Sequence, residues 1–268
     1  MKDISIYQKN YQENGYFIAE KYLNKNIILE INQFLDSSKQ EVSIPYSDGV
    51  PWGYGNLIQN DLFMSWFPLD DIKTNIKDFI NLENQQVNHI LAVNKAPFIG
   101  PDVEWHQEFF NVNTFAPGYN ALEDLNKFMQ IFIALDEHTM ENGPLMIFEG
   151  SHKEGLLPSE DIVNNNLVHK RRLPFKELER ISKKYEQKYV KLKLGDAIFF
   201  NHLLVHGSPT NCSPMRRRAL LLQVRSSEKI KNDSLYEEEV KYRSNFLISN
   251  FESRMSQLVK NNPYKDMK

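Results

Sequence analysis

The sequence predicts a mainly β domain of the α+β class, in which helices flank an antiparallel double sheet. Short apolar runs of strand length dominate residues 87–225, and turn residues such as the Glu-Asn-Gly-Pro at 141–144 separate them. Segments of helical character stand before, between and after these runs, as in domains whose helices are segregated from the sheet. We therefore expect a single domain over residues 1–268, with a helical C-terminal extension from about residue 230.

The N-terminal part is expected to be mainly helical. Residues 4–13 and 70–82 are predicted helices, and residues 24–37 carry apolar side chains at helical spacing. A short strand is expected over residues 15–23, between the helices at 4–13 and 24–37. Residues 40–60 are rich in Gly, Pro, Tyr and Asn, which predicts a long loop, and long loops in compact domains are often functional.

The remaining elements alternate between strands and charged helices. A segment at 174–188 and the tail at 234–260 have the composition of helices. Strands are predicted at 87–95, 103–110, 128–137, 144–150, 189–201 and 217–225.

Composition narrows the function classes. A formal net charge of −3 offers no basic excess that would favour nucleic acid or an anionic membrane. Cys212 is the one cysteine of the chain, which excludes a disulfide framework and a multi-cysteine zinc site. No apolar run reaches the ~20 residues of a membrane span, and the N-terminus lacks the apolar run of a signal peptide. We expect a soluble cytoplasmic protein whose partner is a small-molecule substrate.

A His-x-Glu pair lies in the predicted strand over 103–110. Residues two apart in a strand project from the same face, so His106 and Glu108 present an imidazole and a carboxylate side by side. This is half of a metal site. The alternative is that His106 is a core histidine and Glu108 a surface charge.

His206 is the best distal partner for this pair. It ends an apolar run and is followed by Gly207, Ser208 and Pro209, which places it at the rim of a sheet. His202 competes, because it lies four residues earlier on the same face of a regular strand, but the adjacent turn favours His206. Two histidines and one carboxylate leave coordination positions open, as in non-haem iron(II) oxygenases.

Three consecutive arginines enter the predicted strand at 217–225. Alternation sends Arg216 and Arg218 to one face and Arg217 to the other. An inward guanidinium needs an anionic partner, and a dicarboxylate cosubstrate would supply one through a two-pronged contact. The alternative is a solvated basic patch, which we expect for two of the three arginines.

Several motifs together resemble the phytanoyl-CoA dioxygenase family of iron(II)- and 2-oxoglutarate-dependent oxygenases. WHQE at 105–108 is similar to the family's W-H-Q-D, and NKAP at 94–97 to its lysine-containing strand. IALDEHTMENGPLMIFEGSHKEG at 133–155 resembles its central block, and GDAIFFNHLLVHGSPTNCSPMRRRAL at 195–220 its distal histidine and arginine segment. The resemblance covers about residues 8–225.

The resemblance implies a double-stranded β-helix, a jelly-roll (cupin-like) barrel with helices outside. It implies iron(II) held by His106, Glu108 and His206. The family usually has aspartate where this chain has Glu108, and this difference raises the question of whether iron binding is altered. Related halogenases replace this carboxylate with a small residue that leaves room for chloride, so the resemblance argues against halogenation.

The same resemblance implies a 2-oxoglutarate pocket. Arg217, eleven residues after the distal histidine, would bind the cosubstrate, with Ser208 and Lys95 nearby. Hydroxylation of a C–H bond with O2 is the default reaction, and desaturation or cyclisation would need only a different fate of the substrate radical. A barrel that binds ligands without turnover is the alternative of another class.

Substrate contacts are expected from two places, the residues beside the metal motif and the loop at 40–60. The amides and aromatic rings there favour a small polar metabolite over a fatty acyl chain. The loop is expected to border the mouth of the site. The candidates are Gln107, Phe110, Asn111, Trp52 and Tyr54.

Overall fold

The computed structural model describes part of the chain, namely residues 4–37, 43–45, 51–55, 57–80, 85–108, 128–161 and 171–226. The chain divides into two compact units, Met1–Phe110 with Asn120–Glu228, and Asn111–Tyr119 with Lys229–Lys268. All described residues belong to the first unit. The predicted helical tail lies outside them. None of the described helices is long and apolar enough to cross a membrane.

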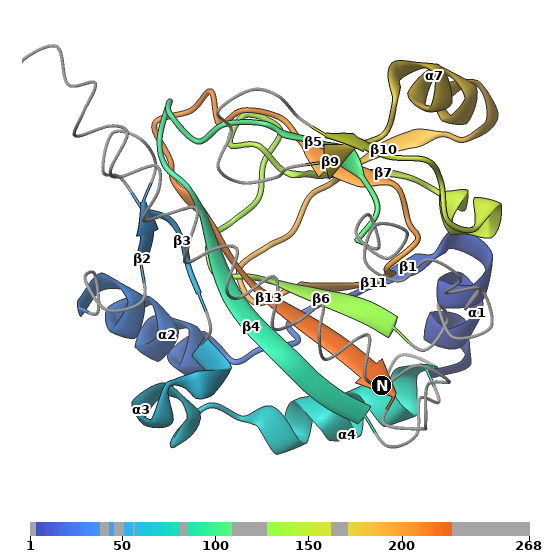
Figure 1. The fold of residues 1–268 in the computed structure, drawn as a ribbon. Coiled ribbons are helices and arrows are strands. Elements are labelled where there is room, and N and C mark those ends of the chain that lie inside the picture. Colours follow the sequence, from blue (N-terminus) through green and yellow to red (C-terminus); the bar gives the residue numbers. More distant parts are fainter. Residues whose placement is uncertain are drawn as a thin grey trace, which may run out of the picture. The chain divides into compact units, whose positions relative to one another are not determined.

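A seven-stranded sheet forms the base of the fold, and each pair of neighbouring strands in it runs antiparallel (Figure 1). The two longest strands, β4 and β13, lie next to each other in it, so their registered residues form a long wall. The order is β1 (Tyr16–Ala19), β11 (Ala197–Asn201), β6 (Phe128–Ala134), β13 (Arg217–Ser226), β4 (Gln85–Lys95), β3 (Pro51–Tyr54) and β2 (Ser43–Pro45).

A four-stranded antiparallel sheet lies over one face of the large sheet and is drawn above it in Figure 1. A separate two-stranded ribbon pairs β8 (Glu160–Asp161) with β9 (Arg171–Arg172). The order of the four-stranded sheet is β10 (Gln187–Val190), β7 (Leu145–Phe148), β12 (His206–Ser208) and β5 (Val103–His106).

Helices cover the opposite face of the large sheet and the flanks of the fold (Figure 1). Below the sheet lie α2 (Lys25–Ser37), α3 (Asp61–Met64), α4 (Leu69–Ile80) and the 3₁₀ turn η1 (Leu57–Gln59), and the other helical elements are α1 (Ile4–Asn14), η2 (Ser151–Glu154) and α7 (Phe175–Lys184).

Strand alternation divides the apolar side chains between two cores. On β6, Ile131 and Ile133 face the helices and join Ile31 of α2 in the larger core. Phe132 and Ala134 face the other way and pack with residues of the smaller sheet such as Leu145. The space between the two sheets, which we call the interior, is therefore walled by the second set of positions.

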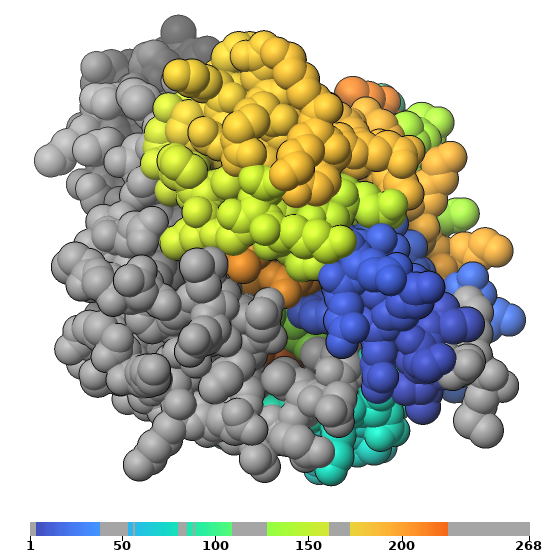
Figure 2. Space-filling model, turned by 90° about the vertical axis from the view of Figure 1, so that its right-hand side faces the viewer, coloured from blue at the N-terminus to red at the C-terminus, as the bar shows by residue number. Residues whose placement is uncertain are grey.

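The N-terminal helix is tied to the segment around residue 150. Figure 2 shows the blue N-terminal residues against the yellow-green part of the surface. The Gly150 N–H donates to the Asn14 carbonyl at 2.8 Å, and the Tyr16 hydroxyl donates to Glu149 at 2.8 Å. These bonds join the start of the chain to the smaller sheet.

The expected class, an antiparallel double sheet with helices outside, is confirmed, but three elements differ. The run at 189–201 is two strands, because the chain turns at Gly195, whose φ is +85° and whose added Cβ would lie 2.6 Å from the Leu23 carbonyl oxygen. The loop at 40–60 contains the short strands β2 and β3. The chain also turns after Asn201, so His206 begins a strand instead of ending one, and His202 lies in the turn.

Candidate metal centre and cosubstrate pocket

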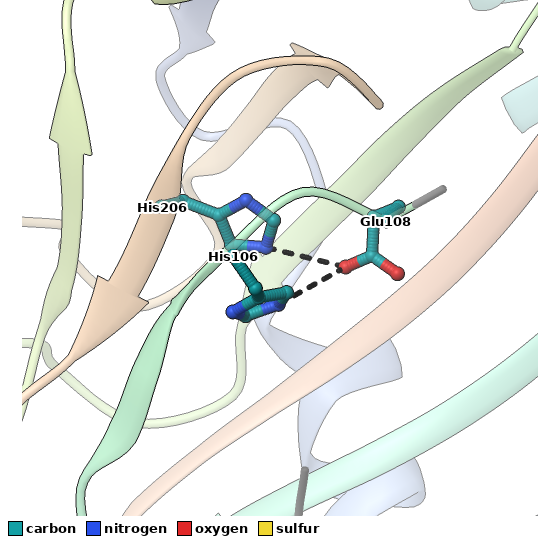
Figure 3. Close-up of side chains that lie close together, drawn as sticks. All are labelled: His106, Glu108 and His206. Carbon is teal, nitrogen blue, oxygen red and sulfur yellow. Dashed lines mark hydrogen bonds and ion pairs between the residues drawn. The ribbon is translucent and has the colours of Figure 1, made fainter. Parts of the chain in front are cut away.

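Two neighbouring strands of the smaller sheet bring the candidate metal ligands together. His106 ends β5 and His206 begins β12, and the two are registered partners with ring centroids 4.1 Å apart. Glu108 follows β5, and its backbone N–H donates to the His202 carbonyl at 3.0 Å. One ligand atom from each of the three buried side chains lies within 4.8 Å of the others (Figure 3). The expected triad is thus gathered at one point.

Hydrogen bonds fix which nitrogen of each ring faces this point. Nδ1 of His106 donates to the Glu104 carbonyl at 2.6 Å, and Nδ1 of His206 donates to the Leu204 carbonyl at 2.8 Å. A carbonyl only accepts, so Nδ1 carries the hydrogen and a neutral ring turns the lone pair of Nε2 inward. Both Nε2 atoms face Oε1 of Glu108, at 3.7 Å from His106 and 3.2 Å from His206. Three converging electron-pair donors fit a shared cation.

The protonation states also suit a metal. Burial, followed by the nearby His206, lowers the pKa of His106. Burial acts to raise the pKa of Glu108, but the adjacent rings of His106 and His206 outweigh it and hold that pKa well below its usual range. A neutral imidazole and an ionised carboxylate are the forms that bind metal ions. Two nitrogens and one carboxylate are the donor set of non-haem iron(II) sites.

A pocket of about 130 Å³ opens from the triad into the interior. This is room for on the order of ten water molecules or a small organic anion, so the pocket holds more than an ion. Its walls are mainly apolar, which keeps water from the metal side. Besides the triad it is lined by Leu91, Val93, Asn94, Lys95, Pro101, Val103, Phe132, Leu145, Phe200, Gly207, Ser208, Arg217 and Leu221.

The pocket contains two buried basic side chains that are registered partners on β13 and β4. Arg217 is 2% exposed, and its Nε and Nη2 donate to the Gly143 carbonyl at 3.0 and 2.7 Å. Lys95 is 5% exposed, and its Nζ donates to the carbonyls of Pro101 at 2.7 Å, Ser208 at 3.3 Å and Pro209. Burial, then Arg217, lowers the pKa of Lys95 to about 6. An anionic ligand would offset the burial and the repulsion that lower this pKa, so the pair favours an anion over a neutral ligand.

The arginine run differs from expectation at one position. Arg217 points into the pocket, and the exposed Arg216 pairs with Asp136 at 3.3 Å. Arg218 faces away from the pocket as alternation requires, but it is buried, not solvated. The reason is that α2 covers this face of the sheet and supplies Asp36 and Asn32 as partners, with Nη1 of Arg218 3.0 Å from Oδ1 of Asn32.

Gln107 has a structural place in the fold and is absent from the pocket lining. Its Nε2 donates to the carbonyls of Gly155 at 2.9 Å and Leu203 at 2.7 Å, and its Oε1 accepts from the Leu157 N–H at 2.8 Å. These bonds hold the metal-binding segment against two turns. The structure therefore assigns its amide to the protein and not, as expected, to a substrate.

Among the described residues of the early loop, β3 lies beside the pocket-lining strand β4. Tyr54 is registered with Ala92 and belongs to the core on the helix side of the sheet, so its expected substrate contact is wrong. Trp52 lies in β3 beside the pocket-lining strand β4, but its side chain is outside the described part. Phe110 and Asn111 also lie outside the described residues, so their substrate role stays a prediction.

Gly143 was missed in the sequence. Its carbonyl holds Arg217, its φ is +78°, and an added Cβ would lie 2.6 Å from the Pro209 carbonyl oxygen and 2.9 Å from Cδ of Lys95. The Glu-Asn-Gly-Pro signal marked the turn but not its contact with the pocket. The positive φ and the close approach require glycine here.

The family comparison agrees with this geometry. The family model described as Phytanoyl-CoA dioxygenase (PhyH) matches residues 11–219. The chain belongs to this family. The peroxisomal phytanoyl-CoA dioxygenase of Mus musculus is 22% identical over 246 residues, which cover 82% of this chain and 68% of that one. Phytanoyl-CoA dioxygenase of Arabidopsis thaliana is 31% identical over 137 residues, 50% of this chain and 42% of that one. The chain thus spans about two thirds of the mammalian PhyH relative and less than half of the plant one.

Solved structures show the same fold. EctD from S. alaskensis, solved with 2-oxoglutarate and 5-hydroxyectoine, has a TM-score of 0.65 at 16% identity, over 82% of this chain and 74% of that one. The epimerase SnoN, in complex with Fe3+, alpha ketoglutarate and nogalamycin RO, has a TM-score of 0.64 at 14% identity, over 84% of each chain. The expected jelly-roll fold of the PhyH family is confirmed by these neighbours.

Proposed function

We propose that the protein is an Fe(II)- and 2-oxoglutarate-dependent dioxygenase that hydroxylates an unactivated C–H bond of a small molecule. One observation carries the proposal: a buried set of two imidazoles and a carboxylate shares a pocket with the two buried basic side chains of Arg217 and Lys95. Iron(II) fits the two imidazoles and the carboxylate, and a dicarboxylate fits the two basic side chains. Membership of the PhyH family and structural neighbours that contain iron and 2-oxoglutarate support the same pair of cofactors.

Each residue of the pocket has a task in this reaction. Bound iron(II) and 2-oxoglutarate supply the oxidative decarboxylation of 2-oxoglutarate by O2, which releases succinate and carbon dioxide and provides the oxidant for a C–H bond. Arg217 anchors the far carboxylate of 2-oxoglutarate through paired N–H donors, and the Gly143 carbonyl holds the guanidinium in place. Lys95 donates to the carbonyls of Pro101 and Ser208 and so connects the ends of β4 and β12, and a bound anion would favour its charged form.

Two structural features favour turnover over simple ligand binding. The three ligand atoms converge in a buried place, and a barrel without chemistry would gain nothing from burying these polar groups. Apolar side chains such as Phe132, Leu145 and Phe200 line the pocket and exclude water from a reactive oxidant. Hydroxylation is the simplest outcome, and desaturation or cyclisation would use the same residues.

The test is anaerobic reconstitution with iron(II), followed by addition of 2-oxoglutarate, O2 and a metabolite library, with succinate release as the readout. We expect one bound iron per chain and substrate-stimulated succinate. Glu108→Ala removes a ligand and should lose both iron and succinate, whereas Arg216→Ala changes an exposed side chain and should retain both. Wild-type protein that binds neither iron nor 2-oxoglutarate would contradict the proposal.

A further inference from the structure

A row of polar side chains crosses the interior face of the large sheet beside the pocket. Gln223 of β13 is registered with Gln130 of β6 on one side and with His89 of β4 on the other. We call these three residues the polar row. Each of the three lies two residues from a pocket-lining residue on its own strand and so faces the same side of the sheet. The pairs are Gln130 and Phe132, Gln223 and Leu221, and His89 and Leu91. The polar row therefore faces the interior and not the helices.

The polar row lies next to the metal centre. On its other side Gln130 is registered with Phe200, which lines the pocket and whose ring is 5.0 Å from that of His206. Leu221 and Phe132 form the adjacent register row, about 7 Å along the strands. Arg217 is six positions before Gln223 on β13, so the end of the pocket that holds Arg217 and the polar row are about 20 Å apart along that strand.

Gln130 is the member of the polar row whose burial and hydrogen bonding need an explanation. It is 0% exposed, and neither its Oε1 nor its Nε2 has a hydrogen-bond partner among the described residues. Gln107 is similarly buried, yet both of its amide atoms are hydrogen-bonded to backbone. A buried amide without partners destabilises the fold, so it is expected where a ligand completes the bonds.

We propose that the polar row is a substrate subsite that binds a neutral hydrogen-bonding group, an amide or a hydroxyl, and that Gln130 makes the principal contact. This inference rests on the proposed function, because it places the group beside the metal. A glutamine amide offers both a donor and an acceptor, which match a group that also has both. A charged group would be desolvated beside uncharged amides, and an alkyl chain would leave the Gln130 amide without partners.

The substrate arm of the test uses pairs of compounds that share a carbon skeleton, one an amide or alcohol and the other the carboxylate or amine. Succinate release is measured for each with wild type, Gln130→Met and Met129→Leu. Met is close to Gln in length but lacks the amide, and Met129 is the neighbour that faces the helices. We expect neutral members to stimulate wild type, with KM raised at least tenfold in Gln130→Met and unchanged in Met129→Leu. Stimulation by charged members alone, or equal KM in Gln130→Met, would overturn the subsite.

The stability arm needs no substrate. If the amide of Gln130 has no partner within the protein, Gln130→Met should raise the Tm above that of wild type. A lowered Tm would mean that the amide is bound by the protein itself and would overturn the proposal. Anaerobic binding of iron(II) and 2-oxoglutarate is measured on the same samples. It should be equal in wild type and Gln130→Met, and its absence from both would count against the proposed function and not against the subsite.

Discussion

Two adjacent arginines on β13 show how the two faces of the large sheet differ. Arg218 faces the helices, is buried, and is paired with Asp36 and Asn32 of α2. Arg217 faces the interior, is equally buried, and donates to the Gly143 carbonyl in a pocket that also holds Lys95. One cation is neutralised by the protein and supports the fold. The other lies beside a second basic side chain in the pocket, an arrangement suited to an anionic ligand.

The same contrast extends to the rest of the two faces. The helix side is a continuous apolar core that includes Ile31, Ile131 and Leu222, and its burial contributes to stability. The interior side faces the metal ligands and holds Lys95 and Gln130 among apolar residues. Substitutions on the helix side should therefore change stability, and substitutions in the interior should change ligand binding.

The largest effect is expected from removing a metal ligand. His206→Ala should weaken iron(II) binding by more than ~100-fold, since even the loss of a group that merely supports a ligand costs 10–100-fold. His152→Ala is the matched control, because His152 bonds to the Gln12 carbonyl away from the triad. Anaerobic competition against a colorimetric chelator measures both. Equal affinity in His206→Ala and wild type would remove His206 from the site.

The next effect concerns stability on the helix side. Ile31→Ala opens a cavity at a side chain that is 0% exposed and should lower the free energy of unfolding by about 2–5 kcal/mol. Leu29→Ala on the same helix changes a side chain that is 49% exposed and should cost less than ~0.5 kcal/mol. Urea unfolding measures both. Iron affinity of folded Ile31→Ala should match wild type, and a large loss would show that the two faces are not independent.

A smaller effect is expected from the titration of Lys95. Its pKa falls from 10.5 to about 6 on folding, so between these pH values the unfolded chain holds a proton that the folded chain lacks. Its contribution to the free energy of unfolding therefore rises with pH across that window, by at most ~1.4 kcal/mol per pH unit. Lys95→Met should show a shallower rise than wild type in urea unfolding between pH 6.5 and 9. Parallel pH profiles would mean that Lys95 remains charged when folded.

Much of the site could be predicted from local sequence rules. The alternation of the arginines depends only on strand geometry and holds in the structure. His106 and Glu108 do converge, but β5 ends at His106 and Glu108 lies in the turn that follows, so strand alternation is not the reason. Long apolar runs likewise located β4 and β13, whose central positions are buried by neighbours on both sides.

The remaining features depend on contacts between distant segments. The burial of Arg218 requires α2 to lie across the sheet, and the role of Gln107 requires the turns at Gly155 and Leu203 to meet it. Tyr54 was misassigned because loop composition does not reveal that the residues pair with β4 and turn toward the helices. None of these contacts leaves a periodic signal in the sequence.

The binding of 2-oxoglutarate to Arg217 tests the difference between the two faces most directly. Titration of 2-oxoglutarate into iron-loaded protein without oxygen should show affinity weakened about tenfold to several hundredfold in Arg217→Ala, because a charge-assisted contact is worth ~1.5–3 kcal/mol and its loss leaves the carboxylate unpaired. Arg217→Lys should also lose affinity, since an ammonium cannot form the paired contact. Arg216→Ala, an exposed neighbour, should bind as wild type does. Equal affinity in wild type and Arg217→Ala would contradict the assignment of the interior face to the cosubstrate.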